Sequence, residues 1–203
     1  MSADPSMVAS IFFGLFESAE IRFVRRYVAS DLDCLELGSG IGLVSRAIAE
    51  TLQPGRLLVC VEPRADLLVC AKENIRSVAQ GLRCRYISAL VDRMERSDAG
   101  FPILADWINA RMSGVGGANV RTVTLRELAK EFPGRFQVVC DIEGAEESFL
   151  EEACSDVLGR VARMIIELHE TDTASVDDLI ERSVKLGFGL VDRYGSVCAF
   201  VRL

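Results

Sequence analysis

Short apolar runs alternate with segments of helical periodicity along most of the chain. The runs have the length of strands that are buried on both faces, and amphipathic segments follow the first five of them. This alternation is typical of a parallel sheet covered by helices on both sides. The expected strands are 33–37, 56–62, 82–88, 136–142, 162–169, 189–194 and 197–203, and the expected helices are 43–51, 64–78, 125–132, 145–158 and 175–186.

The last two expected strands are separated by little more than a Gly-Ser turn. A connection this short joins antiparallel neighbours, so we expect a hairpin at one edge of the sheet. The pattern therefore predicts an α/β fold, with a doubly wound, seven-stranded and mostly parallel sheet whose last strand is antiparallel.

Two stretches fall outside this alternation. Residues 5–29 have the pattern of one or two amphipathic helices, so we divide the chain into an N-terminal helical segment, 1–30, and a main domain, 31–203. Residues 90–121 follow neither period and contain the Gly-rich sequence GVGGAN. A loop of this length within a compact domain is usually functional, and we expect a lid or a substrate-facing insertion.

Charge and hydropathy limit the possible partners. The formal net charge of −7 disfavours a nucleic acid, because phosphate affinity comes from clustered lysine and arginine. The cluster of Arg22, Arg25 and Arg26 stands beside Glu17 and Glu20, so we expect a solvated, charge-balanced helix face. No apolar run is long enough for a membrane span, and the first residues lack the basic start of a secretory signal, so a cytoplasmic protein is expected.

The seven cysteines do not form a recognisable metal or disulfide pattern. Their number is odd, they include no CxxC pair, and most lie inside apolar stretches such as LLVCVE. Buried free thiols in a reducing compartment are therefore expected.

The sequence LELGSGIG, 35–42, has the composition of a ligand-binding turn between a strand and a helix. Glycine is needed where the backbone turns sharply and where a ligand lies against the main chain. The spacing of Gly38, Gly40 and Gly42, around Ser39, is GxGxG and differs from the GxGxxG that binds a pyrophosphate. Glu36 would repel a pyrophosphate but is complementary to the sulfonium and ammonium of S-adenosylmethionine (SAM).

Glu62 ends the second expected strand, about twenty residues beyond the glycine loop, where a carboxylate can accept hydrogen bonds from both ribose hydroxyls. The position serves NAD and SAM proteins alike, and a solvated glutamate at a strand end is the alternative without function. Ser88, Ala89 and Leu90, near the end of the third strand, would then flank the adenine.

The sequence VVCDIEGAEESFLEEA, 138–153, contains a second candidate site. Asp141 and Glu143 follow a buried strand, at the sheet edge where open α/β sheets bind ligands. The next strand brings Glu167 and His169 to the same edge. His169, the only histidine, has three open interpretations: a general base, a metal ligand, or a strand-end residue with a structural role.

These residues together resemble the FkbM family of SAM-dependent methyltransferases, within the class I methyltransferase superfamily. The resemblance rests on LELGSGIG, on VEPRADLLVCAKENI, and on DIEGAEESFLEEA followed by IIELHE, and it extends from about Cys34 to Glu170. Two departures stand out, since the family usually has Asp for Glu36 and Gly-Ala-Asn-x-Gly in the glycine loop. A Rossmann-like sheet that ends in an antiparallel strand agrees with this superfamily.

The resemblance implies methyl transfer from SAM to a hydroxyl oxygen of a small molecule, a glycan or a lipid. It assigns Glu36, Gly38, Ser39, Gly40 and Gly42 to the methionine part, Glu62 and Pro63 to the ribose, and Ser88 and Ala89 to the adenine side. Asp141 and Glu143 would face the sulfonium and the acceptor, with His169 as the first choice of base. A divalent ion on these three residues is conceivable, but their spacing does not establish it, and no metal is predicted.

Three other functions remain open. An NAD-linked oxidoreductase shares the glycine loop and Glu62 but leaves DIEGAE unexplained, and a non-catalytic SAM-binding module would bind SAM without turnover. A nucleic-acid amino methyltransferase is disfavoured, because the fourth strand ends in DIEG and lacks the Asp/Asn-Pro-Pro-Tyr/Phe that grips a flipped base. The sequence leaves the acceptor and the oligomeric state undetermined.

Overall fold

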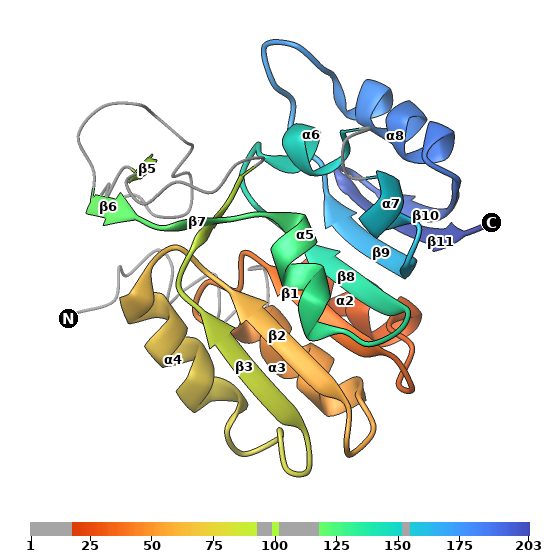
Figure 1. Cartoon of the computed structure of the whole chain (residues 1–203). Coiled ribbons are helices and arrows are strands. Elements are labelled where there is room, and N and C mark those ends of the chain that lie inside the picture. The colour runs from red at the N-terminus through yellow and green to blue at the C-terminus, as the bar shows by residue number, and fades with distance from the viewer. Residues whose placement is uncertain (1–17, 93–98, 102–117, 152–154) are drawn as a thin grey trace.

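The computed structural model describes residues 18–92, 99–101, 118–151 and 155–203. Within these residues the main sheet has seven strands in the spatial order β10-β11-β9-β8-β1-β2-β3 (Figure 1). The strands are β1 Asp33–Leu37, β2 Leu57–Val61, β3 Arg83–Ile87, β8 Phe136–Cys140, β9 Val161–Glu167, β10 Phe188–Tyr194 and β11 Val197–Arg202.

The strand directions confirm the predicted fold. Strand β1 pairs in parallel with both β2 and β8, and the parallel pairing continues to β3 on one side and to β9 on the other. Strand β11 is antiparallel to both of its neighbours, β9 and β10. From β1 the sheet is first extended on one side, by β2 and β3, and then on the other side, by β8 and β9. The strand order therefore reverses between β1 and β8. Open α/β sheets bind their ligands at such a point, outside the carboxyl ends of the strands.

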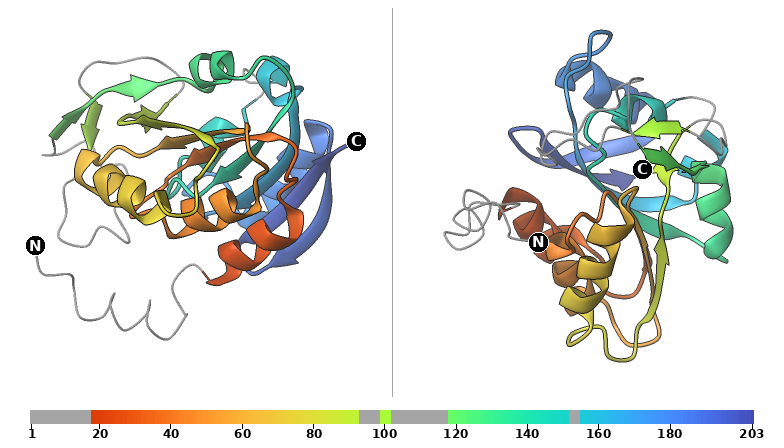
Figure 2. Two further views of the ribbon diagram at one scale, coloured as in Figure 1. Left: turned by 90° about the horizontal axis from the view of Figure 1, so that it is seen from below. Right: turned by 90° about the vertical axis from the view of Figure 1, so that its left-hand side faces the viewer.

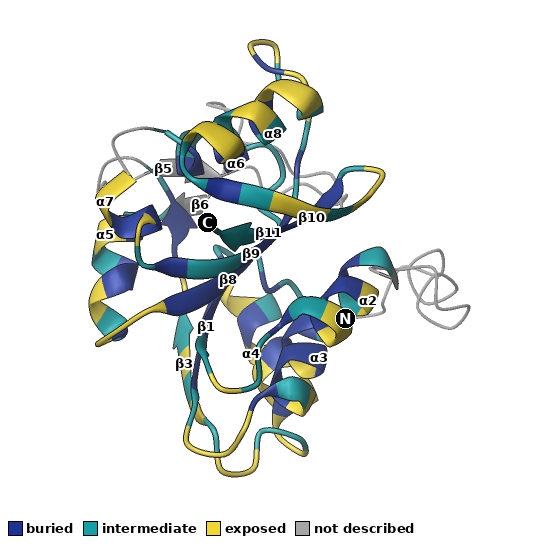
Figure 3. Ribbon diagram, turned by 90° about the vertical axis from the view of Figure 1, so that its right-hand side faces the viewer, coloured by how far each residue is buried: buried dark blue, intermediate teal, exposed yellow. Residues whose placement is uncertain are grey.

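Alternate side chains of each central strand enter two separate cores. On β1, Leu35 belongs to one core and Cys34 to the other, and Val138 and Val139 divide in the same way on β8. Helices α2 Ser18–Tyr27, α3 Leu43–Thr51 and α4 Ala65–Ile75 cover one face. Helices α5 Leu125–Leu128, α6 Glu146–Phe149, α7 Ser155–Leu158 and α8 Val176–Lys185 cover the other (Figure 2). Burial on both faces explains why the central strands β2 and β8 are almost wholly apolar, whereas β3 and β10, at the two edges of the sheet, are more exposed and include charged residues (Figure 3).

Two predicted helices are less regular than expected. The segment 125–132 is α5 followed by the 3₁₀ helix η2 Ala129–Glu131. The segment 145–158, expected as one helix, contains the two short helices α6 and α7, and residues 152–154 between them lie outside the described residues. Buried pairs at 149–150 and 157–158 are spaced by about two helical turns, so their periodicity resembles that of one helix.

The expected insertion is closed at its base by a strand pair that the sequence did not predict. Strand β4 Leu90–Val91 pairs in parallel with β7 Thr122–Val123, and β5 Ala99–Phe101 pairs antiparallel with β6 Ala118–Val120. Residues 93–98 and 102–117 lie outside the described residues. Its role as a lid, and the division of the chain at residue 30, stay predictions.

Helix α2 is the described part of the expected N-terminal helical segment. Its arginines are exposed as predicted, and Arg25 approaches Glu50 of α3 to 3.7 Å. The prediction of a solvated face is wrong for Glu20, which is only 3% exposed. Its carboxylate points toward the sheet, close to those of Asp141 and Glu167. Glu17 falls outside the described residues.

The described cysteines and helices agree with two further expectations. Six cysteines are free thiols, and the buried ones are Cys34, Cys60, Cys140 and Cys198. None of the described helices combines the length and the apolar character that crossing a membrane requires.

Candidate functional site

The glycine loop after β1 lies against the loop after β8. The backbone N–H groups of Gly38 and Ser39 both donate to the carbonyl oxygen of Val61, which fixes the turn against β2. Gly38 has φ +84°, and a Cβ built on it would lie 1.6 Å from the backbone oxygen of Asp141. Only glycine fits here, because the two main chains touch.

The other two glycines of the loop have different surroundings. A Cβ on Gly42 would lie 2.6 Å from the Cα of Ala71, so this glycine allows α3 and α4 to pack closely. Gly40 has φ +49°, and a Cβ built on it would meet no atom of the described residues within 4 Å. Gly40 therefore turns its open side toward unfilled space, as a backbone that receives a ligand must.

Glu62 faces the glycine loop, as the sequence predicts. Its carboxylate accepts hydrogen bonds from the backbone N–H of Gly40 and from that of Arg64, each 3.0 Å long. The residue is 6% exposed, and burial raises the pKa of its carboxyl despite these two hydrogen bonds. Glu62 is therefore a buried carboxylate that is hydrogen-bonded to the loop, and the alternative of a solvated strand-end glutamate does not fit.

Two buried polar atoms near the loop have no hydrogen-bond partner among the described residues: Oε1 of Glu36 and Oγ of Ser39. The other carboxylate oxygen of Glu36 accepts a 2.6 Å hydrogen bond from Ser45. Glu36 is 1% exposed, and burial raises its pKa to about 7 although the Ser45 hydrogen bond acts in the opposite direction. Buried polar atoms are rarely left without partners in proteins, so this pair marks a place that a polar ligand would complete.

The residues predicted for the adenine side lie beside Glu62. The hydroxyl of Ser88 donates to the backbone oxygen of Pro63 over 3.3 Å. The backbone N–H of Ala89 donates to the backbone oxygen of Glu62. Ser88 is exposed, whereas the side chain of Ala89 is fully buried in the core. These residues thus adjoin the predicted ribose site, but only Ser88 presents its side chain outward.

The loop after β8 makes the tight turn that the sequence indicates. Glu143 has φ +52°, the only positive φ outside glycine among the described residues, and Gly144 follows with φ +101°. Helix α6 begins two residues later. The turn places both Asp141 and Glu143 at the carboxyl end of the sheet.

Glu146, in the first turn of α6, holds this loop together, and the sequence analysis gave it no role. Its side chain is fully buried, and its two oxygens accept hydrogen bonds from the backbone N–H groups of Ile142 and Gly144, each 3.0 Å long. The same carboxylate lies 3.2 Å from Nδ1 of His169. A glutamate at the start of a helix is a recognisable capping signal, but its contact with a histidine just beyond the end of β9 has no local signature.

His169 turns its second nitrogen toward the two predicted carboxylates. Nε2 lies 3.6 Å from an oxygen of Glu143 and 4.0 Å from Oδ1 of Asp141. Burial lowers the pKa of the imidazole, but the hydrogen bond to Glu146 and the surrounding negative charges outweigh it and raise that pKa to about 9. The three predicted catalytic residues therefore meet at one point.

A second group of acids adjoins the first. Glu20, Asp141 and Glu167 bring carboxylate oxygens within 4.8 Å of one another, so Asp141 belongs to both groups. Glu167 also accepts a 2.9 Å hydrogen bond from Ser196. Burial and the charges of Glu167 and Glu143 raise the pKa of Asp141. Glu20 is the member that sequence reasoning missed.

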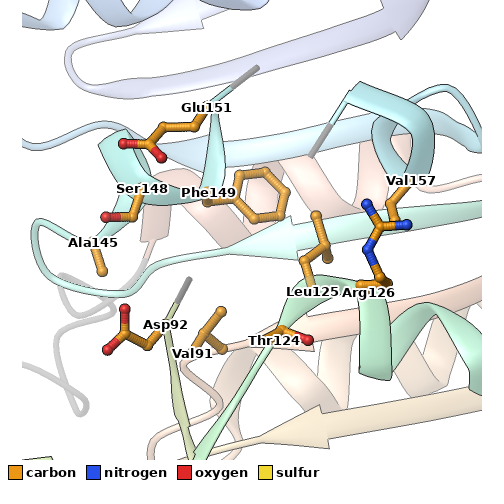
Figure 4. Close-up of a pocket in the computed structure, with 10 residues that line it drawn as sticks. All are labelled: Val91, Asp92, Thr124, Leu125, Arg126, Ala145, Ser148, Phe149, Glu151 and Val157. Atoms are coloured by element: carbon orange, nitrogen blue, oxygen red, sulfur yellow. The ribbon is translucent and has the colours of Figure 1, made fainter. Parts of the chain in front are cut away.

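A separate pocket lies between the β4–β7 pair and helices α5, α6 and α7 (Figure 4). Its volume is about 250 Å³, and apolar side chains such as Leu125, Phe149 and Val157 form much of its wall. It contains none of the predicted site residues, although Ala145 on its rim directly follows Gly144.

Solved structures share this fold, whereas comparisons of the sequence alone find nothing. No family model matches the chain, and no curated protein matches it. An rRNA methylase from Streptococcus thermophilus superposes with a TM-score of 0.54 at 10% identity, covering 91% of this chain and 95% of that one. A ribosomal protein L11 methylase from Lactobacillus delbrueckii subsp. bulgaricus gives 0.53 at 14% identity, covering 93% and 79%.

A third structure carries a bound ligand. Magnesium protoporphyrin IX methyltransferase from Synechocystis PCC 6803, solved with S-adenosylhomocysteine, superposes with a TM-score of 0.51 at 14% identity, covering 92% of this chain and 81% of that one. At such low identity these likenesses show the fold alone, a Rossmann-like sheet that this chain shares with these methyltransferases. They do not test the resemblance to the FkbM family.

Proposed function

We propose that the protein is a SAM-dependent methyltransferase of FkbM type that methylates a hydroxyl oxygen of a small molecule, a glycan or a lipid. The observation that supports this most directly is the pair of buried carboxylates, Glu36 and Glu62, beside the open backbone of Gly40. A pyrophosphate would be repelled there, whereas a nucleoside with cationic groups is attracted. The class I methyltransferase fold agrees with this choice.

The residues around the loop fit SAM part by part. Glu62 would exchange its hydrogen bond with Gly40 for hydrogen bonds from the ribose hydroxyls. The unpartnered atoms of Glu36 and Ser39 offer acceptors to the methionine part, while Pro63, Ser88 and Ala89 adjoin the ribose on the adenine side. When bound, SAM supplies a sulfonium methyl group: its S–CH₃ bond breaks as the acceptor oxygen forms the O–CH₃ bond, and the hydroxyl proton is lost.

Asp141, Glu143 and His169 are the groups available to position the acceptor and accept its proton. Alignment and exclusion of water provide most of the acceleration in such a displacement, and a base adds to it. The raised pKa of His169 favours the protonated imidazole in the ligand-free protein. A base role for His169 therefore requires a positive charge near the carboxylates, which lowers that pKa.

The acceptor is proposed to be a neutral or cationic molecule, although some proteins of the same fold are RNA methylases. The acids at the site and the net charge of −7 repel a polyanion. Asp141 and Glu143, together with the extra carboxylates of Glu20 and Glu167, favour an acceptor rich in hydroxyl groups.

Calorimetric titration with SAM, S-adenosylhomocysteine and NAD tests the cofactor. We expect SAM and S-adenosylhomocysteine to bind and to raise the melting temperature, and NAD to do neither. Binding of NAD alone would favour the oxidoreductase alternative. Release of S-adenosylhomocysteine, measured over a panel of sugars, polyols, hydroxylated lipids and total RNA, then tests the acceptor. SAM binding without turnover on any of them would favour the non-catalytic module, and turnover on RNA alone would contradict the proposed acceptor.

A further inference from the structure

Three potential metal ligands surround one point where β8 and β9 end. One donor atom from each of Asp141, Glu143 and His169 lies within 4.8 Å of the other two. Nε2 of His169 is 3.6 Å from Glu143 and 4.0 Å from Oδ1 of Asp141, so both separations exceed a hydrogen bond. The three donors face one another across a gap.

The histidine of this group is held in the orientation that a metal ligand needs. Its Nδ1 lies 3.2 Å from Glu146, whose fully buried carboxylate is fixed by the backbone N–H groups of Ile142 and Gly144. An imidazole that ligates a metal through one nitrogen commonly donates its other N–H to a carboxylate, which fixes its tautomer. Glu146 provides this contact and leaves Nε2 directed at Asp141 and Glu143.

Asp141 supplies an oxygen that nothing else satisfies. Its Oδ1 has almost no accessible surface and no hydrogen-bond partner among the described residues, and it is the Asp141 oxygen that lies 4.0 Å from Nε2 of His169. A buried carboxylate oxygen is costly unless a donor or a cation compensates it. This observation is independent of the count of acids around it.

The spacing of the donors suits a small octahedral cation. Ligands bound to Mg²⁺ at 2.0–2.1 Å lie about 3 Å apart when adjacent and about 4 Å apart when opposite. The observed separations of 3.6 and 4.0 Å fall between these limits. The Glu143 side chain is 33% exposed, so it has room to move toward a bound ion.

We propose that Asp141, Glu143 and His169 bind a divalent cation of the Mg²⁺ or Mn²⁺ type, with Glu146 as the residue that positions His169. Two carboxylates and one imidazole are oxygen-rich ligands that suit these ions. Three protein ligands leave further coordination positions for water or for oxygen atoms of a substrate. The site is defined by contacts in the ligand-free protein and does not depend on the proposed function.

In the proposed methyltransferase the cation has a specific consequence. A hydroxyl oxygen that coordinates the cation would be more acidic and would release its proton to water as the O–CH₃ bond forms, so His169 would serve as a ligand and not as the base. This step rests on the proposed function. It favours acceptors with two neighbouring oxygen atoms, such as vicinal diols.

Titration with Mn²⁺ tests the site, because electron paramagnetic resonance distinguishes free from bound Mn²⁺ without SAM, an acceptor or turnover. We expect one bound ion per chain, with affinity at least tenfold weaker in Glu143→Gln and in His169→Ala. Glu170→Gln is the matched control, since Glu170 is exposed, follows His169 and carries the same charge. Its affinity should stay within about twofold of the original protein. Circular dichroism verifies that each variant is folded. If His169→Ala does not fold, the affinity of Glu143→Gln alone tests the proposal.

Glu167→Gln separates this site from the adjacent acids Glu20, Asp141 and Glu167. Binding that is weakened by Glu167→Gln and unaffected by His169→Ala and Glu143→Gln would place the ion among those acids and overturn the proposal. Absence of Mn²⁺ binding at millimolar concentration would overturn it as well, and so would equal weakening in Glu170→Gln. SAM binding is measured in a separate experiment, so the failure of the cation site would not by itself contradict the proposed function.

Discussion

The carboxylate of Glu62 accepts a 3.0 Å hydrogen bond from the backbone N–H of Gly40, across the gap between the end of β2 and the glycine loop. A buried carboxylate and an open glycine are thereby held in contact before any ligand is present. A ribose that binds at this point replaces one partner of Glu62 and finds the other groups already in place, so little ordering of the loop is required.

Glu62→Ala should weaken SAM binding by tenfold or more. The proposed hydrogen bonds from the two ribose hydroxyls to this carboxylate are charge-assisted and contribute about 1.5 kcal/mol each. Calorimetry at a temperature where both proteins are folded measures the effect. Glu73→Ala, an exposed carboxylate on α4, is the control and should leave SAM affinity unchanged. An unchanged affinity in Glu62→Ala would refute the ribose assignment.

Alanine at Gly38 and at Gly40 should have different effects. At Gly38 the new Cβ would overlap the backbone of Asp141, so we expect a loss of about 3 kcal/mol or more in the free energy of unfolding. At Gly40 the Cβ meets no protein atom, and the left-handed backbone costs about 1 kcal/mol. Gly40→Ala should nevertheless weaken SAM binding by at least tenfold, because the methyl group occupies the ligand's space.

Gly55→Ala is the matched control for Gly40→Ala. Gly55 also has a positive φ, +87°, and open space around its Cβ, but it lies in the turn before β2, away from the site. Chemical denaturation should show a similar small loss of stability, and calorimetry should show unchanged SAM affinity. If the two variants bind SAM equally well, Gly40 does not face the ligand.

Glu36→Gln should change how stability depends on pH in the absence of SAM. The pKa of Glu36 is raised from 4.5 to about 7 in the folded protein, so between these values the folded state binds more protons than the unfolded state. The original protein therefore loses stability as pH rises through this window, by about 3 kcal/mol in total, and the glutamine variant lacks this loss. Urea unfolding of both proteins between about pH 5 and pH 8 measures the difference. A difference independent of pH would contradict the burial of an ionisable Glu36.

His169→Ala should lower turnover by about a hundredfold or more while SAM affinity stays nearly intact. The imidazole lies with Asp141 and Glu143, and the predicted cofactor contacts are made by the glycine loop and Glu62. Steady-state kinetics with the identified acceptor, together with calorimetry for SAM, separate the two quantities, and Glu170→Gln again serves as the control. Equal losses of turnover and SAM affinity, or loss of folding, would indicate a structural role for His169.

The sequence predicted the sheet well because local patterns contain the relevant information. Each expected strand lies within two residues of the observed one, since apolar runs bounded by turn residues mark both ends. Residues 145–158 were expected as one helix because their buried positions repeat at helical spacing on both sides of the interruption.

The candidate site was predictable in part for the same reason. Asp141 and His169 each follow a recognisable strand, and parallel strands bring their carboxyl ends to one edge. The buried position of Glu20 was not predictable, because it depends on how α2 packs against the sheet beside Asp141 and Glu167. The contact of Glu146 with His169 likewise joins two residues that are far apart in the sequence, and no local sequence pattern predicts it.

The contact between Gly38 and Asp141 makes the two halves of the site mechanically inseparable. It is a contact of main chain against main chain, with no room for even one additional carbon atom, so the glycine loop cannot shift toward β8 without displacing Asp141. A substitution elsewhere cannot delete this linkage, and only a change in the course of the backbone itself would uncouple the two loops.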